Sequence, residues 1–237
     1  DCSKEKHKFS VGENGLWTLD EANGTKELVG GCITGVSAAD ECNARICAVS
    51  QYRGSLRLYN VNIVGNSSNS SGAGLRIFDT YSSSDYGIYM YSGNIVGNCA
   101  PSGAGVFTES NEFHMYGGTI ADNHATNYGG GIFCEDSKTR NCLINIFGGT
   151  ISGNSARRGG GVYLGTDKNL FFMAGGEIKD NKAFEIGGGI YGLGQPLFGT
   201  RDYTGPITIY DNYVENEGSK IPNNLYLPKN SKMRALD

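Results

Sequence analysis

One short motif recurs along most of the chain: an isoleucine, two further residues and an asparagine. It occurs six times with successive copies 25 to 32 residues apart, and its asparagines are Asn66, Asn98, Asn123, Asn154, Asn181 and Asn212. A motif that returns with such a period marks an internal repeat, in which each copy is one unit of a stacked solenoid. The repeated residues are therefore expected to hold the stack together rather than to form a catalytic site.

Each repeat contains further elements in a fixed order. A strand-like segment with large apolar residues at its first and third positions precedes the motif, as in 113–116 and 144–147. After the asparagine, a small-residue triplet leads directly into an apolar residue, as in 129–132 and 159–162. We therefore expect three short strands per repeat, joined by two tight bends and one variable loop. Each strand has its like one period later, so like strands stack in parallel at the usual strand spacing.

This pattern predicts an all-β fold, a single-stranded right-handed parallel β-helix of about six to seven coils. Residues 30–227 are expected to form the β-helix, 1–29 an N-terminal cap over the first coil, and 228–237 a C-terminal tail. Atypical ends are expected because an open solenoid exposes a sheet edge and apolar core. A degenerate copy at 30–36 precedes the six, and Ile46 is expected to take the place of the apolar residue that follows the glycine triplet.

The repeated asparagines have a physical role if they stack at one bend. Each carboxamide can then donate to one neighbour and accept from the other, which forms a hydrogen-bonded ladder. The residue before each asparagine is glycine or aspartate, and both tolerate the positive φ of a tight turn. Asp122, Asp180 and Asp211 are therefore interpreted as turn residues rather than as ligands.

Charge and cysteine content limit the class of protein. The net charge is −4, and the 20 basic and 24 acidic residues are intermixed, which gives no sign of nucleic-acid binding. No hydrophobic run is long enough to span a membrane. The start at Asp1 favours a processed chain, and the seven cysteines favour an oxidising compartment. We therefore expect an extracellular or cell-surface location.

Several residues of the loops are candidates for covalent modification. A disulfide between Cys134 and Cys142 would close the base of a variable loop. The pairing of the other five cysteines stays open; they are Cys2, Cys32, Cys42, Cys47 and Cys99. Acceptor sequons for glycosylation occur at Asn23, Asn66 and Asn69. Asn66 lies in the expected ladder and is a poor acceptor, whereas Asn69 lies in a serine-rich loop.

The repeats resemble those of right-handed β-helix surface proteins, notably the polymorphic outer-membrane-protein type. The resemblance covers about residues 55–227 and rests on the Gly-Gly-Gly segments before Ile132, Val162 and Ile190 and on the Ile-x-x-Asn element, where that type has Phe-x-x-Asn. It implies a β-helical adhesin or other surface component. It supplies no catalytic residues.

Outward-facing aromatic residues form two expected columns. One is Tyr59, Tyr91, Tyr116 and Phe147, and the other is Phe107, Phe133, Tyr163 and Tyr191. Stacked in successive coils, they would form exposed aromatic ladders. Such ladders either stiffen the sheet or offer a surface for a glycan or a protein.

An enzyme is the competing class, because β-helices also carry polysaccharide lyases and glycoside hydrolases. Glycoside hydrolysis needs two carboxylates at one bond, and Asp180 with Asp211 is the best pair here. The stacked turn explains that pair better, and His114 is expected to be a solvated surface residue. The sequence contains no nucleophile–base pair, phosphate loop or zinc motif, so no catalytic residue, metal or cofactor is expected. Ice binding would need a regular row of threonines on one face, and the corresponding row in this sequence is too mixed.

We therefore predict an extracellular, non-catalytic structural or adhesive protein. Its expected partners are surface glycans or further copies joined end to end as a filament. The alternative is a carbohydrate-active enzyme.

Overall fold

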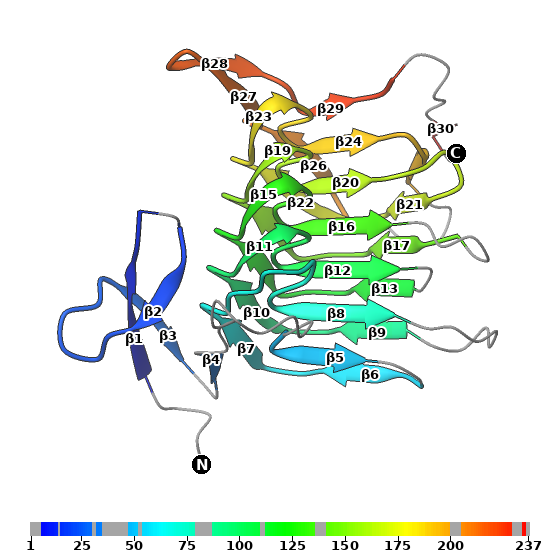
Figure 1. Ribbon diagram of the computed structural model, residues 1–237. Helices are drawn as coiled ribbons and strands as arrows, with labels where there is room; N and C mark the ends of the chain where they lie inside the picture. The colour runs from blue at the N-terminus through cyan, green and yellow to red at the C-terminus, as the bar shows by residue number, and fades with distance from the viewer. Residues whose placement is uncertain are drawn as a thin grey trace.

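The chain forms a stack of β-strand turns with a small separate sheet at its side (Figure 1). The computed structural model describes residues 6–13, 15–29, 32–34, 47–51, 54–78, 87–109, 112–135, 141–199, 205–228 and 234–235. Within these ranges the regular structure is all β, and no helix is long and apolar enough to cross a membrane.

Four sheets form the sides of the stack, and we number them I to IV in the order in which the chain visits them. Sheet I contains the repeat isoleucines and comprises β4 (Cys32–Thr34), β7 (Val61–Val64), β10 (Gly93–Val96), β14 (Thr119–Ala121), β18 (Thr150–Ser152), β22 (Gly176–Lys179) and β26 (Ile207–Tyr210). Sheet II follows the asparagines and comprises β11 (Cys99–Ser102), β15 (His124–Tyr128), β19 (Ser155–Arg158), β23 (Lys182–Ile186), β27 (Tyr213–Asn216) and β28 (Ser219–Pro222).

The other two sheets complete each turn. Sheet III follows the glycine triplets and comprises β5 (Val49–Gln51), β8 (Leu75–Phe78), β12 (Val106–Glu109), β16 (Ile132–Glu135), β20 (Val162–Leu164), β24 (Ile190–Gly192) and β29 (Leu225–Tyr226). Sheet IV comprises β6 (Leu56–Leu58), β9 (Gly87–Met90), β13 (Glu112–Met115), β17 (Leu143–Ile146), β21 (Leu170–Met173), β25 (Gln195–Phe198) and β30 (Arg234–Ala235). The pairing between turns is parallel throughout, so the predicted parallel β-helix is confirmed.

The predicted three strands per turn are wrong, because sheet II supplies a fourth. Its strands have mostly polar sequences and one small residue that points inward, an alanine in β11, β15, β19 and β23 and Val214 in β27. The alternation of large apolar residues that marks the other strands is missing there, so the sequence pattern did not reveal them. Three of the sheets have seven strands, but only the five turns that begin with β10, β14, β18, β22 and β26 contain all four kinds of strand.

The interior is filled by the inward side chains of sheets I, III and IV. In each turn an isoleucine of sheet I meets apolar residues of the other two sheets, for example Ile120, Ile132 and Phe113, which are fully buried. Strand β4 confirms the degenerate first copy, since Ile33 pairs with Ile63. Ile46 lies outside the described residues, and the partner of Leu75 in sheet III is Val49 instead.

The asparagine ladder lies at the bend between sheets I and II. Asn123 Nδ2 and its backbone N both donate to Asn154 Oδ1, at 2.9 and 3.1 Å, and Asn154 repeats this pattern toward Asn181. Each carboxamide also donates to an isoleucine carbonyl of the preceding turn, as Asn154 does to Ile120 at 2.9 Å. The six asparagines are at most 1% exposed, and the ladder predicted from the sequence is confirmed.

The ladder has a seventh member that the repeat pattern did not reveal. After the antiparallel hairpin of β27 and β28, the chain returns and places Asn224 beside Asn212. Asn224 Oδ1 accepts from both Asn212 Nδ2 and Asn212 N at 3.0 Å, which is the pattern of every earlier turn. The hairpin and Asn224 thus close this corner at the C-terminal end. Strand β30 pairs with β25, so the β-helix extends into the expected tail.

Residues 6–29 form an antiparallel sheet in the order β2 (Trp17–Leu19), β1 (Lys6–Val11), β3 (Lys26–Val29). Its described contacts lie on the side of the stack, not across the first coil where a cap was expected (Figure 1). Trp17 packs against Val64 and Val96, and its backbone N donates to the Gly97 carbonyl at 3.0 Å. A Cβ on Gly65 would lie 1.7 Å from the Trp17 carbonyl oxygen, so this contact requires glycine.

Candidate functional site

The aromatic column on sheet IV lies on the surface and is regular. Tyr59, Tyr91, Tyr116 and Phe147 stack with ring centroids 4.7 to 4.9 Å apart and interplanar angles of 1 to 14°. Tyr59 is 58% exposed and Tyr116 40% exposed. Because each inner ring is sandwiched between its neighbours, the column presents ring edges to solvent along its length.

A second row runs beside this column on sheet IV. The Arg57 guanidinium lies over the Tyr89 ring at 5.4 Å, and Tyr89 stacks on the His114 ring at 4.6 Å. His114 Nε2 is also hydrogen bonded to Glu112 at 2.9 Å, and its Nδ1 contacts Asn145 Nδ2 at 3.1 Å. The prediction that His114 is a solvated surface residue is therefore wrong: its side chain is 12% exposed and partnered on both ring nitrogens.

The other predicted column is buried, which corrects the expectation of two exposed ladders. Phe107, Phe133, Tyr163 and Tyr191 are 1 to 8% exposed. Tyr128 and Ile186, from the ends of sheet II strands, pack over them, and the Arg76 guanidinium lies over Phe107 at 4.9 Å. Burial raises the pKa of Tyr163 to about 12. This column is part of the packed structure and offers no contact surface.

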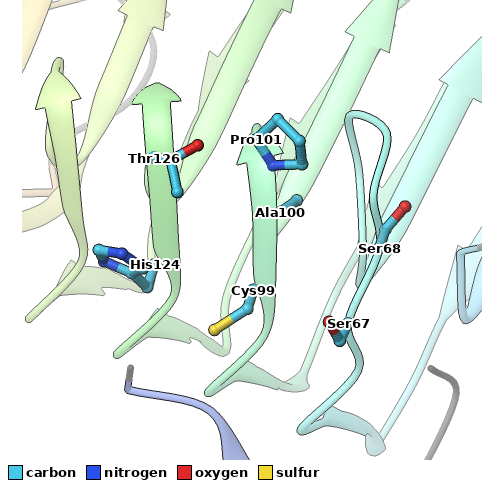
Figure 2. Close-up of a pocket in the computed structure, with 7 residues that line it drawn as sticks. All are labelled: Ser67, Ser68, Cys99, Ala100, Pro101, His124 and Thr126. Carbon is cyan, nitrogen blue, oxygen red and sulfur yellow. The ribbon is translucent and has the colours of Figure 1, made fainter. Parts of the chain in front are cut away.

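A cavity of about 260 Å³ lies on the outer side of sheet II, beside the N-terminal sheet (Figure 2). Figure 2 shows Cys99 and His124 at the start of the neighbouring strands β11 and β15. His124 Nδ1 is hydrogen bonded to Ser155 Oγ at 2.8 Å, and burial, with a contribution from Lys182, lowers the pKa of His124. Burial raises the pKa of Cys99 to about 11, so its thiol stays protonated and weakly nucleophilic at neutral pH.

The sequence analysis missed the pair of His124 and Ser155. Each of the two residues directly follows a ladder asparagine, so the repeat register placed them on adjacent strands. That register was the signal that could have found them. The observed hydrogen bond makes this pair a contact between two adjacent turns.

A larger cavity of about 490 Å³ lies at the C-terminal end of the bend between sheets I and II. Its lining residues come from the last two turns and the terminal hairpin: Asp180, Tyr210, Asp211, Asn212, Tyr213, Lys220, Pro222 and Asn224. Asp180 and Asp211 have φ of 56° and 52°, as expected for turn residues before a ladder asparagine. The structure thus brings the two candidate carboxylates into one cavity, which the sequence pattern did not predict.

The modification candidates are placed as follows. Cys134 and Cys142 form the predicted disulfide, while Cys47 and Cys99 are half-buried thiols outside that disulfide. Cys2 and Cys42, whose pairing was left open, lie outside the described residues, and so does the side chain of Cys32. Asn69 is exposed and Asn23 is near the end of a surface turn, whereas Asn66 is buried in the ladder. Among the described residues, no group of three or more histidine, cysteine, aspartate or glutamate side chains is placed to hold a metal.

Comparisons of the chain with family models, with curated proteins and with solved structures found no match. The class defined by the fold is the parallel β-helix. The resemblance to polymorphic outer-membrane-protein repeats remains a prediction from the sequence.

Proposed function

We propose that this chain is an extracellular, non-catalytic β-helix with a structural or adhesive role. The observation that supports it best is the continuous asparagine ladder, which joins every turn from Asn66 to Asn224 by buried hydrogen bonds. Two aromatic columns run parallel to it along the stack. Three ladders along one axis make a stiff rod, and a stiff rod suits a spacer or a surface support.

The disulfide supports the extracellular part of this proposal. Cys134 and Cys142 are bonded across a loop between sheets III and IV, and such bonds persist in oxidising compartments. The test is immunolabelling of intact, non-permeabilised source cells together with mass spectrometry of the Cys134–Cys142 peptide. Surface label and an oxidised peptide are expected. Label that appears only after permeabilisation would overturn the extracellular assignment.

Assembly of copies end to end is the finer form of the structural role. In the last turn Ile207, Ile209 and Leu225 are only partly buried, and Ile221 of the terminal hairpin is 48% exposed. Apolar residues and short strands at a solenoid end are a surface on which another copy can pack. Analytical ultracentrifugation should show oligomers that Ile221→Lys converts to monomers. A monodisperse monomer at high concentration would exclude the filament.

A carbohydrate-active enzyme remains the second candidate, and one observation favours it: Asp180 and Asp211 line the same cavity. Incubation with a panel of polysaccharides, followed by assays for new reducing ends and unsaturated sugars, tests it. No product is expected from the wild-type chain. Product release that Asp180→Asn abolishes would replace the non-catalytic proposal with the enzymatic one.

A further inference from the structure

We propose that the cavity at the C-terminal end of the bend between sheets I and II binds a neutral glycan. This inference rests on the adhesive form of the proposed function and gives it a location and a ligand class. The cavity volume of about 490 Å³ falls within the range of small-ligand pockets. Its walls are the bends after β22 and β26 on one side and the β27–β28 hairpin on the other.

The bend is open at the last turns and is covered by the N-terminal sheet at the earliest ones. In the earlier turns Trp17 of the N-terminal sheet packs on Gly65 and Gly97, and Lys26 approaches Asp122 at 3.8 Å. The residue directly before the bend position differs between the two regions. It is Val64 or Val96 under the N-terminal sheet and Lys179 or Tyr210 at the cavity.

The two carboxylates supply hydrogen-bond acceptors for sugar hydroxyls. Asp180 and Asp211 occupy equivalent positions in adjacent turns, and both are exposed. Within the described part of the chain, neither carboxylate is hydrogen bonded or ion-paired with another residue. An ionised carboxylate accepts only, through two oxygens, so each can receive two neighbouring hydroxyl groups of a pyranose.

The two tyrosines supply apolar contact for the sugar ring. The Lys220 ammonium lies over the Tyr213 ring at 4.3 Å, and the Lys179 ammonium lies over the Tyr210 ring at 5.6 Å. A ring face that holds a cation attracts positively polarised groups, and a ligand occupies that face once the lysine moves aside. The C–H groups on the apolar face of a pyranose are polarised in that way and can take the place of Lys220 on Tyr213. Lys179, in contrast, is held by an ion pair with Glu177 at 2.8 Å.

The charge of the cavity selects a neutral ligand. Asp180 and Asp211 contribute two negative charges and Lys220 one positive charge to the lining. A uronic acid or a sulfated sugar would bring further negative charge beside the carboxylates and would be repelled. The two amides of the lining, of Asn212 and Asn224, already bond to each other in the ladder.

The test is a glycan array of neutral and acidic oligosaccharides, followed by calorimetry with the best neutral glycan. The variant is Asp180→Gly/Asp211→Gly, since Gly65, Gly97 and Gly153 occupy this bend position in other turns and adopt the same positive φ. The matched control is Asp122→Gly, the same change at a bend outside the cavity. The double variant should bind at least about tenfold more weakly, because hydrogen bonds to charged groups contribute that much. The control should bind like the wild type, and the double variant should melt like the wild type.

Three outcomes are distinguishable. Wild-type affinity in the double variant, or a preference for acidic glycans, would overturn this site. Binding that survives in the double variant but is lost in Tyr59→Ala would keep the adhesive proposal and move the contact to sheet IV. Failure of every glycan to bind would overturn the site while leaving a purely structural role intact.

Discussion

The two aromatic columns look alike in the sequence and differ in the structure. The column on sheet IV is exposed, and its rings are parallel within 14°. The column on sheet III is buried; its rings Phe107, Phe133 and Tyr163 meet at angles of 60 and 76°, whereas Tyr163 and Tyr191 stack within 6°. Both columns follow the same rise from turn to turn, so the stacking distance alone does not produce the difference.

The cause is what lies beside each column. Rings on sheet IV touch other rings mainly above and below, and the strand spacing then favours parallel stacking. Rings on sheet III are also packed from the side by Tyr128 and Ile186, and where Tyr128 contacts Phe133 and Tyr163 these two rings meet edge to face. An outward position in a strand thus becomes core when the neighbouring sheet curves over it.

The largest loss of stability is expected from a substitution in a third column, the asparagine ladder, which is buried and polar. Asn154→Ala would leave Asn123 N and Nδ2 without their acceptor, and each orphaned buried donor costs about 1–3 kcal/mol. Asn224→Ala removes the acceptor of the half-exposed end of the ladder and should cost less, because solvent can replace it. Urea unfolding of both variants measures this, and equal small losses would contradict a stabilising ladder.

The second-largest loss of stability is expected in the buried aromatic column on sheet III. Phe133→Ala removes a ring that is 6% exposed and should lower the free energy of unfolding by about 3–5 kcal/mol. Tyr116→Ala, at the equivalent kind of position on sheet IV, is the matched comparison and should cost far less. If the two variants lose the same stability in urea, the distinction between covered and exposed columns is wrong.

A smaller effect appears at alkaline pH. Burial raises the pKa of Tyr163 to about 12, from a usual value of 10.0. The folded chain therefore holds this proton while the unfolded chain releases it, so stability is present below pH 10 and is lost as the pH rises toward the folded pKa. Tyrosinate absorbance during titration, with Tyr163→Phe as control, should show one late ionisation that the variant lacks. Its persistence in the variant would assign it to another tyrosine.

The smallest effect is expected from the middle of the exposed column. Tyr91→Ala removes its stacks with Tyr59 and Tyr116, which are cross-strand contacts worth about 0.2–1 kcal/mol each. Thermal melting should shift only slightly. A loss as large as that of Phe133→Ala would show that sheet IV depends on this column for its integrity.

The repeat made most of the architecture predictable. The spacing of the Ile-x-x-Asn motif located sheet I and the ladder, because a buried carboxamide chain tolerates no other residue at those places. Sheet II was not predicted, because each of its strands carries a single small inward residue and its other residues are mostly polar. Asn224 was not predicted as a member of the ladder, because a hairpin rather than a repeat brings it beside Asn212.

The candidate site was predictable in part. The positions of Asp180 and Asp211 followed from the repeat, but the cavity depends on the hairpin at Lys220, which shares no pattern with the turns. The place of the N-terminal sheet depends on the contact of Trp17 with two glycines. A glycine in a turn signals its own backbone freedom and not the partner that packs on it, so sequence alone could not pair these residues.

The ladder also bears on how such a chain can change in length. Each turn offers two donors and one isoleucine carbonyl to the asparagine of the next turn, so every inner junction is chemically the same. Duplication of a whole period would therefore insert a turn whose partners already exist, and deletion of one would reunite two compatible neighbours. The rod can lengthen or shorten in whole units while Asn224 and its hairpin continue to close the final turn.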